Sequence, residues 1–66
     1  MDNKEYARYE QWVDRVIVHY ERDRRARKFR RTMIDNDGIA FYHQLRWTAY
    51  CEQLQPREFV RSMRVP

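Results

Sequence analysis

The sequence has 66 residues and a net charge of +4, enough for one small domain that would bury only about 60% of its unfolded surface. Charged residues make up 36% and aromatic residues 15%, which excludes an ordinary disordered chain, because such chains are poor in aromatic side chains. The single cysteine argues against a disulfide-stapled secreted scaffold, and no apolar run is long enough for a membrane span. We therefore expect a cytoplasmic protein with no membrane partner, in the host cytoplasm if the chain is viral.

A first long helix is predicted over residues 3–34, because Asp2 and Asn3 are good N-caps and no glycine or proline interrupts the segment. Its first half carries aromatic and aliphatic residues at helical spacing, which indicates one apolar face. We predict that this face binds a partner protein or a second copy of the chain through Tyr6, Tyr9, Trp12, Val13, Val16 and Tyr20.

The apolar face does not continue into the second half of this helix. At 100° per residue its continuation is occupied by Arg24, Arg27 and Arg31, while Phe29 and Met33 lie on roughly the opposite side. A single straight helix therefore cannot bury both apolar faces against one neighbour.

Basic residues are concentrated between residues 21 and 31. This segment has seven basic and two acidic residues, a net charge of +5, whereas the other 55 residues carry seven basic and eight acidic ones, a net charge of −1. Arginine presents a planar fork of donors suited to phosphate and to guanine edges. The predicted nucleic-acid contacts are Arg22, Arg24, Arg25, Arg27, Lys28, Arg30 and Arg31.

The run ERDRRARKFRR resembles the arginine-rich motif of small RNA-binding peptides, such as the antitermination proteins of lambdoid phages. The resemblance covers about eleven residues and is a similarity of type and not of descent. It implies a helix that enters a nucleic-acid groove with cations on all its sides. The alternative is a solvated helix surface in which Glu21 and Asp23 pair with Arg25 and Arg27 at i,i+4 spacing, or one that faces an acidic protein partner.

The rest of the chain predicts a turn and two further helices. Residues 35–38, Asp-Asn-Asp-Gly, form the turn, and a second helix follows over about 39–54. Pro56 at a first helical position predicts a short third helix over about 56–63. The expected fold of the single domain, residues 1–66, is all-α: an antiparallel hairpin of two long helices plus a short carboxyl-terminal helix, completed by dimerisation or a partner.

No constellation for catalysis, metal binding or cofactor binding is recognisable. His19, His43 and Cys51 lack metal-ligand spacing, and the turn at residues 35–38 lacks the remaining ligands of a calcium loop. Glycine-rich phosphate loops and catalytic triads are absent from the sequence. We therefore expect a binding protein without metal or cofactor, and not an enzyme.

Two functions remain open from the sequence. The first is binding of DNA or RNA through residues 22–31. The second is a protein-binding role, as a small phage-type inhibitor or adaptor of a larger host complex, or as a minor structural component of an assembly, anchored by the aromatic face of the first helix. Both are compatible with a homo-oligomer.

Overall fold

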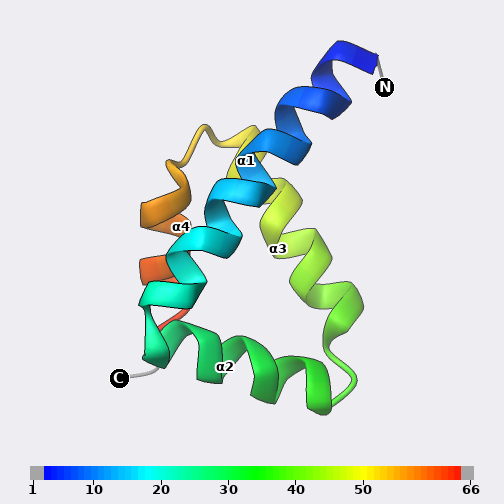
Figure 1. The fold of residues 1–66 in the computed structure, drawn as a ribbon. Coiled ribbons are helices and arrows are strands. Elements are labelled where there is room, and N and C mark those ends of the chain that lie inside the picture. The colour runs from blue at the N-terminus through cyan, green and yellow to red at the C-terminus, as the bar shows by residue number, and fades with distance from the viewer. Residues whose placement is uncertain (1–2, 65–66) are drawn as a thin grey trace.

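The computed structural model describes residues 3–64 and consists of helices joined by short turns (Figure 1). The helices are α1 (Asn3–Arg22), α2 (Arg24–Asp35), α3 (Ile39–Cys51) and α4 (Pro56–Ser62), and the described residues contain no strand. The all-α prediction is confirmed. The predicted cap Asp2 lies outside the described residues.

The long first helix predicted over residues 3–34 is wrong, because the chain bends at Asp23. This residue has extended backbone angles, φ −118° and ψ 95°, and its carboxylate accepts a hydrogen bond of 3.1 Å from the backbone N–H of Ala26. It is therefore the N-cap of a new helix, a role that aspartate favours. As a result α2 crosses the end of α1 in Figure 1 and the predicted hairpin of two long helices is not confirmed.

The bend allows both apolar faces of residues 3–34 to enter one core. Val16 and Tyr20 of α1 are each 1% exposed, and Ala26 of α2 is fully buried. The core is completed from α3 and α4 by Tyr42, Ala49, Phe59, Val60 and Met63. The prediction that the face from Tyr6 to Tyr20 is available to a partner is therefore wrong for Val16 and Tyr20.

The packing of α4 against α1 covers that second half. Pro56 occupies the start of α4, where its missing N–H costs no helical hydrogen bond, and Phe59 and Val60 are buried. Because α4 is joined to α3 by a short loop, the end of α3 is brought close to α1. The indole N–H of Trp12 donates to the backbone oxygen of Leu54 at 2.8 Å across this junction.

Helix α3 ends at Cys51, three residues before the predicted end at residue 54. Gln53 has φ 62°, in the left-handed region, and the N–H of Leu54 turns back to the oxygen of Ala49 at 3.0 Å. This geometry is typical of a helix carboxyl terminus. It directs the half-buried Leu54 against the core.

The turn between α2 and α3 depends on the small size of Gly38. Its N–H donates to the oxygen of Met33 at 2.8 Å, and its φ of −92° is open to any residue. A Cβ atom at this position would lie 2.7 Å from both the Cγ and the backbone oxygen of Met33. Glycine is therefore required here by close approach of the chain and not by its backbone angles.

Candidate nucleic-acid interface

Helix α2 presents a stripe of cations on the side that faces away from the core. Its members follow the i, i+3, i+4, i+7 spacing of one helix face, and all are exposed: Arg24, Arg27, Lys28 and Arg31. On the opposite side Ala26 is buried, and Phe29 and Met33 pack against the core. We call the four exposed residues the α2 stripe.

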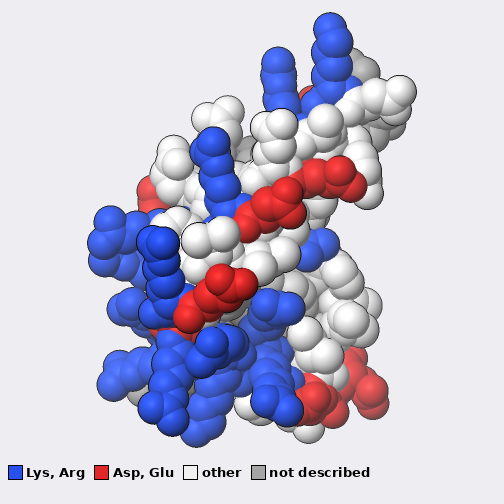
Figure 2. Space-filling model, viewed as in Figure 1, with Lys and Arg blue, Asp and Glu red and all other residues white. Residues whose placement is uncertain are grey.

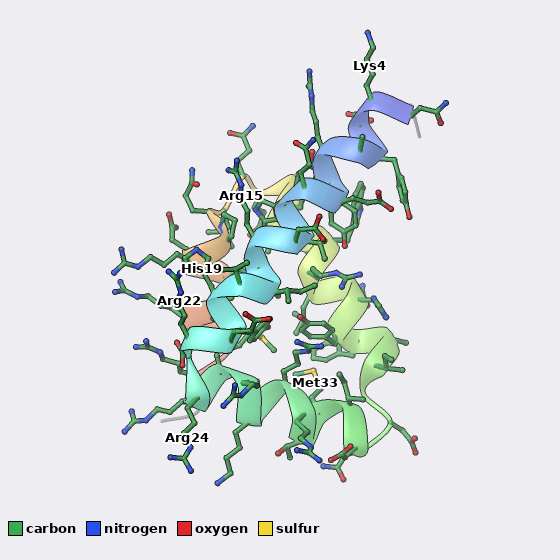
Figure 3. The ribbon with its side chains drawn as sticks, viewed as in Figure 1. Lys4, Arg15, His19, Arg22, Arg24 and Met33 are labelled. Carbon is green, nitrogen blue, oxygen red and sulfur yellow. The ribbon has the colours of Figure 1, made fainter. Side chains whose placement is uncertain are left out.

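The buried face of α2 changes one expectation about this segment. The sequence resemblance implied cations on all sides of the helix, as in a peptide surrounded by a nucleic-acid groove. Met33 points from α2 towards the other helices while Arg24 points outwards (Figure 3). Only the outer part of α2 is therefore available to a ligand.

Arg30 differs from its neighbours because it belongs to the packing of the chain. Its guanidinium carbon lies 5.0 Å from the centre of the Tyr20 ring and 5.6 Å from that of Tyr42, distances at which cation–π attraction operates. The residue is half-buried, whereas Arg22 and Arg25 are exposed. Arg30 therefore has a structural role, and we do not include it in the α2 stripe.

A second group of cations lies in a groove between α1 and α4. The groove has a volume of about 130 Å³. We call it the α1–α4 groove; it is lined by His19, Arg22, Asp23, Arg57, Val60, Arg61 and Arg64. His19 and Arg22 extend from one side of α1, together with Arg15 (Figure 3).

The arginines of α4, and Arg64 just after it, were missed by the sequence-based prediction. Arg57, Arg61 and Arg64 recur at intervals of four and three residues, which is the signal of one helix face, but the local charge is lower there than in residues 22–31. What brings them beside Arg22 is the packing of α4 on α1, a tertiary contact.

The two groups form one basic surface around the bend at Asp23. Figure 2 shows Lys and Arg side chains gathered over α2 and over the adjoining parts of α1 and α4. Acidic side chains are seen along α1 and over the turn that follows α2. We use the term basic surface for the α2 stripe together with the α1–α4 groove.

Asp23 is the acid within the α1–α4 groove, and its charge is compensated. Its Oδ2 atom accepts a hydrogen bond of 2.6 Å from the Nε of Arg64, and the aspartate side chain is 11% exposed. Desolvation acts to raise the pKa of this carboxyl, but the hydrogen bonds from the Ala26 amide and from Arg64 outweigh it, so that the pKa lies below its ordinary value. Asp23 therefore stays ionised and paired at neutral pH. Its negative charge neutralises Arg64 and leaves the other arginines of the groove without an acidic partner.

The pairing of Asp23 with Arg27, which belongs to the alternative interpretation of this segment, is absent, and Asp23 pairs with Arg64 instead. Among the described residues, no acidic side chain lies within 4.0 Å of the charged group of an α2 arginine or lysine. The exposed cations of α2 are consequently not neutralised by acidic neighbours in the described part of the chain.

The aromatic face predicted to bind a partner is exposed at one end and buried at the other. Tyr6 is 52% exposed, and Tyr9, Trp12 and Val13 are half-buried. Val16 and Tyr20 lie in the core, which corrects their assignment as partner contacts. The hydroxyl of Tyr20 has no hydrogen-bond partner among the described residues, and burial raises the pKa of this phenol.

Tyr9 and Trp12 form an aromatic seam with α3. The ring centre of Tyr9 lies 5.0 Å from that of Trp47 and 5.1 Å from that of Tyr50, both edge-on, and Trp12 lies 5.7 Å from Tyr50. Edge-to-face pairs at these distances stabilise packing. The half-buried Arg46 joins the seam by donating from Nε to the Tyr9 hydroxyl at 2.9 Å.

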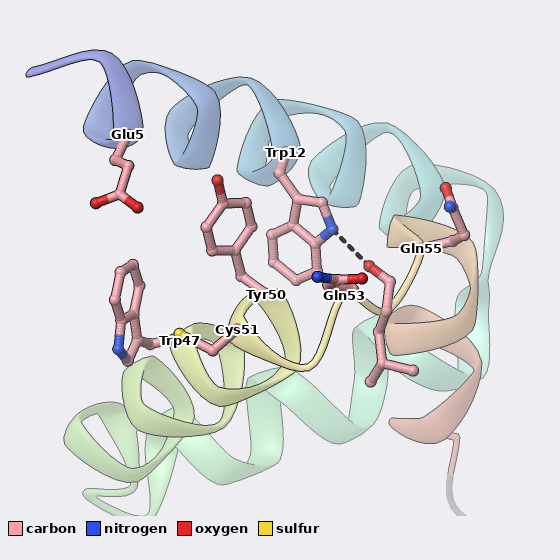
Figure 4. A pocket seen from close by; sticks show the side chains of 8 residues that line it. Glu5, Trp12, Trp47, Tyr50, Cys51, Gln53 and Gln55 are labelled. Carbon is pink, nitrogen blue, oxygen red and sulfur yellow. Dashed lines mark hydrogen bonds between the residues drawn. The ribbon is translucent and has the colours of Figure 1, made fainter. Parts of the chain in front are cut away.

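An open groove of about 680 Å³ lies along this seam (Figure 4). Trp12, Trp47 and Tyr50 form its aromatic wall, and the dashed line in Figure 4 marks the hydrogen bond from Trp12 to Leu54. Glu5 and the polar side chains of Gln53 and Gln55 lie around the aromatic wall. We call this the aromatic groove, and it is separate from the basic surface.

Residues 3–64 contain no cluster of histidine, cysteine, aspartate or glutamate that could hold a metal ion, and Cys51 is an exposed free thiol. None of the described helices has the length and apolar character needed to cross a membrane. Comparison with protein-family models, with curated proteins and with solved structures finds no match to this chain.

Proposed function

We propose that this protein binds nucleic acid through the basic surface, mainly by contacts with phosphates. The observation that carries the proposal is the convergence of two groups of exposed cations, from α2 and from the α1–α4 groove, on one side of the molecule. Phosphate contacts by arginine and lysine supply most of the sequence-independent affinity for nucleic acid, because they release condensed counterions.

The arrangement suits a polyanion better than a single small anion. The cations of the α2 stripe extend from Arg24 to Arg31, eight residues of helix or about 10 Å, and the α1–α4 groove continues the charge beyond the bend. A chain of phosphates can contact both groups at once, whereas one isolated phosphate can contact only one of them.

The test is a titration of a fluorescently labelled oligonucleotide at several salt concentrations. Four phosphate contacts over the basic surface, two from the α2 stripe and two from the α1–α4 groove, correspond to a slope of about −3.6 in a plot of log affinity against log salt, so that affinity should fall about 150-fold between 50 and 200 mM salt. The double variant Arg24→Gln/Arg31→Gln should reduce the slope by about 1.8. An affinity that does not depend on salt would contradict the proposal.

A matched control is available at the amino-terminal end of α1. Lys4→Gln/Arg8→Gln removes the same number of charges from exposed positions far from α2 (Figure 3 labels Lys4 and Arg24). This variant should bind with the parent affinity and nearly the parent slope. Equal losses in the two double variants would mean that net charge alone, and not the basic surface, determines binding.

The second candidate is a protein-binding role, either towards a larger complex or in a homodimer. The observation that favours it is the open aromatic groove, with Trp47 37% exposed at its wall and Tyr6 52% exposed nearby on α1. Tryptophan and tyrosine are enriched in binding hot spots. Trp47→Ala should abolish such an interaction, whereas charge-removing variants of the α2 stripe should only slow association. Measuring the solution mass of the parent and of Trp47→Ala tests the homodimer.

A further inference from the structure

On the basis of the proposed function, we infer that the ligand of the basic surface is double-stranded DNA, with α2 in the major groove and the α1–α4 groove against the phosphates beside it. The inference comes from three features: the exposed half of α2, the absence of exposed aromatic rings from the basic surface, and the size and position of the α1–α4 groove.

Helix α2 can enter a groove only with its outer half. Ala26 is 0% exposed, and Phe29 and Met33 pack on the core, so this side of the helix is covered by the rest of the protein. The major groove of regular A-form RNA is deep and narrow and does not admit protein side chains readily. The major groove of B-form DNA is about 12 Å wide and admits a helix whose other side remains attached to a folded domain.

The length of the α2 stripe fits this position. Helix α2 has 12 residues and is about 18 Å long, and the stripe from Arg24 to Arg31 covers about 10 Å of it. This length is close to the width of the groove between the two phosphate backbones. Arg24 and Arg31, at the ends of the stripe, are therefore assigned to phosphates, and Arg27 and Lys28, at its centre, lie nearest the base edges.

The basic surface lacks the aromatic platforms that proteins use to bind single strands. Base stacking on exposed aromatic side chains supplies much of the affinity for single-stranded nucleic acid. The exposed large aromatic residues are Tyr6 on α1 and Phe41 and Trp47 on α3, outside the basic surface, whereas Tyr20 and Phe59 next to it are buried. The basic surface can therefore contact the phosphate backbone of a base-paired duplex but offers no exposed aromatic ring on which an unpaired base could stack.

The α1–α4 groove supplies a second contact at a fixed position. Its volume of about 130 Å³ is below the roughly 300 Å³ at which pockets for whole small molecules begin, and is suited to one phosphate group. Arg22, Arg57 and Arg61 line it without an acidic partner among the described residues, because Asp23 is engaged by Arg64. The bend at Asp23 joins this groove to the start of α2, so a strand that borders the major groove can pass across it.

The experiment compares three labelled 20-mers of one sequence at equal salt: duplex DNA, single-stranded DNA and duplex RNA. We expect duplex DNA to bind at least tenfold more tightly than either of the others. Equal or tighter binding of single-stranded DNA or of duplex RNA would overturn this inference and leave the proposed function standing. No binding of any of the three at low salt would overturn the proposed function itself.

A modified duplex and a double variant test the two contacts separately. Bulky substituents at C5 of the pyrimidines project into the major groove and should weaken binding at least tenfold, whereas an unchanged affinity would exclude the placement of α2. Arg57→Gln/Arg61→Gln should reduce the salt slope for duplex DNA by about 1.8, and Lys4→Gln/Arg8→Gln should not. A parent-like slope in the Arg57/Arg61 variant, with parent-like helicity by circular dichroism, would exclude the second contact.

Discussion

Replacing Asp23 with alanine should lower the stability of the fold by an amount that can be worked out from its two contacts. The lost N-cap hydrogen bond to Ala26 costs about 1 kcal/mol. The lost ion pair with Arg64 costs about 0.5 kcal/mol, because the arginine side chain is 48% exposed and therefore screened by solvent. The sum of about 1.5 kcal/mol is a substantial part of the roughly 3–10 kcal/mol expected for a domain of 66 residues.

Thermal unfolding followed by circular dichroism measures this effect. For a domain of this size each kcal/mol corresponds to about 4–8 °C, so the Tm of Asp23→Ala should fall by about 6–12 °C. Asp23→Asn keeps an oxygen that can cap α2 and loses only the charge, so its Tm should fall by about 2–4 °C. A Tm of Asp23→Ala within 2 °C of the parent would refute the role of Asp23 in starting α2.

The same residue should give the stability a defined pH dependence. The pKa of Asp23 is lower in the folded protein than in the unfolded chain, where it is about 3.9. The ionised carboxylate therefore adds stability above about pH 4, and this contribution is lost as the pH falls through the folded value. The difference in Tm between the parent and Asp23→Asn should be constant from pH 5 to 7 and shrink below pH 4. A difference that does not change down to pH 2 would contradict this reasoning.

Three further substitutions separate packing from binding. Gly38→Ala places a Cβ atom 2.7 Å from the Met33 oxygen and should lower the free energy of unfolding by about 1–3 kcal/mol, which is measured as a lower Tm. An unchanged Tm would mean that the turn can open to make room for the methyl group. Trp12→Phe removes the donor to the Leu54 oxygen and should lower the free energy of unfolding by about 0.5–1.5 kcal/mol, measured with denaturant. Its oligonucleotide affinity should equal that of the parent. Arg30→Met should lower the Tm through loss of its cation–π contacts and leave oligonucleotide affinity within twofold of the parent; a loss as large as that of an α2-stripe variant would return Arg30 to the binding surface.

The local elements of the fold were accessible from the sequence where a residue has a strong conformational preference. Pro56 predicts the start of the last helix because its ring fixes φ, and Gly38 with its polar neighbours predicts a turn because these residues are disfavoured inside helices. The end of α3 at Cys51 was not predicted, since Gln53 in the left-handed region has no such signal.

The bend at Asp23 shows why the arrangement of helices was not predictable in the same way. Aspartate inside an arginine-rich run is compatible with a continuous helix stabilised by i,i+4 pairs, and it is equally compatible with an N-cap. The choice is made by tertiary packing, because only the bent chain buries Val16, Tyr20 and Ala26 in one core. The sequence did contain the conflict, in the two apolar faces that a straight helix cannot bury together.

For the candidate site, sequence reasoning identified the members of the α2 stripe by charge density alone. It could not separate Arg30 from them, because a contact with Tyr42, twelve residues further along the chain, decides its position. It also missed Arg57 and Arg61, whose proximity to Arg22 depends on how α4 packs. Residues defined by composition were found, and residues defined by long-range contacts were not.

The gathering of cations at one end of the molecule also has a kinetic consequence. Residues 21–31 carry a net charge of +5 and the other 55 residues −1, and Figure 2 shows most cations over α2 and the adjoining parts of α1 and α4, so the charge distribution of the protein is asymmetric. In the field of a polyanion such a molecule experiences a torque that turns α2 towards the ligand before contact. The protein therefore meets the ligand more often in the orientation that can bind, and association is faster at low ionic strength. At 0.01 M salt the Debye length is about 30 Å, which approaches the 35 Å length of the protein.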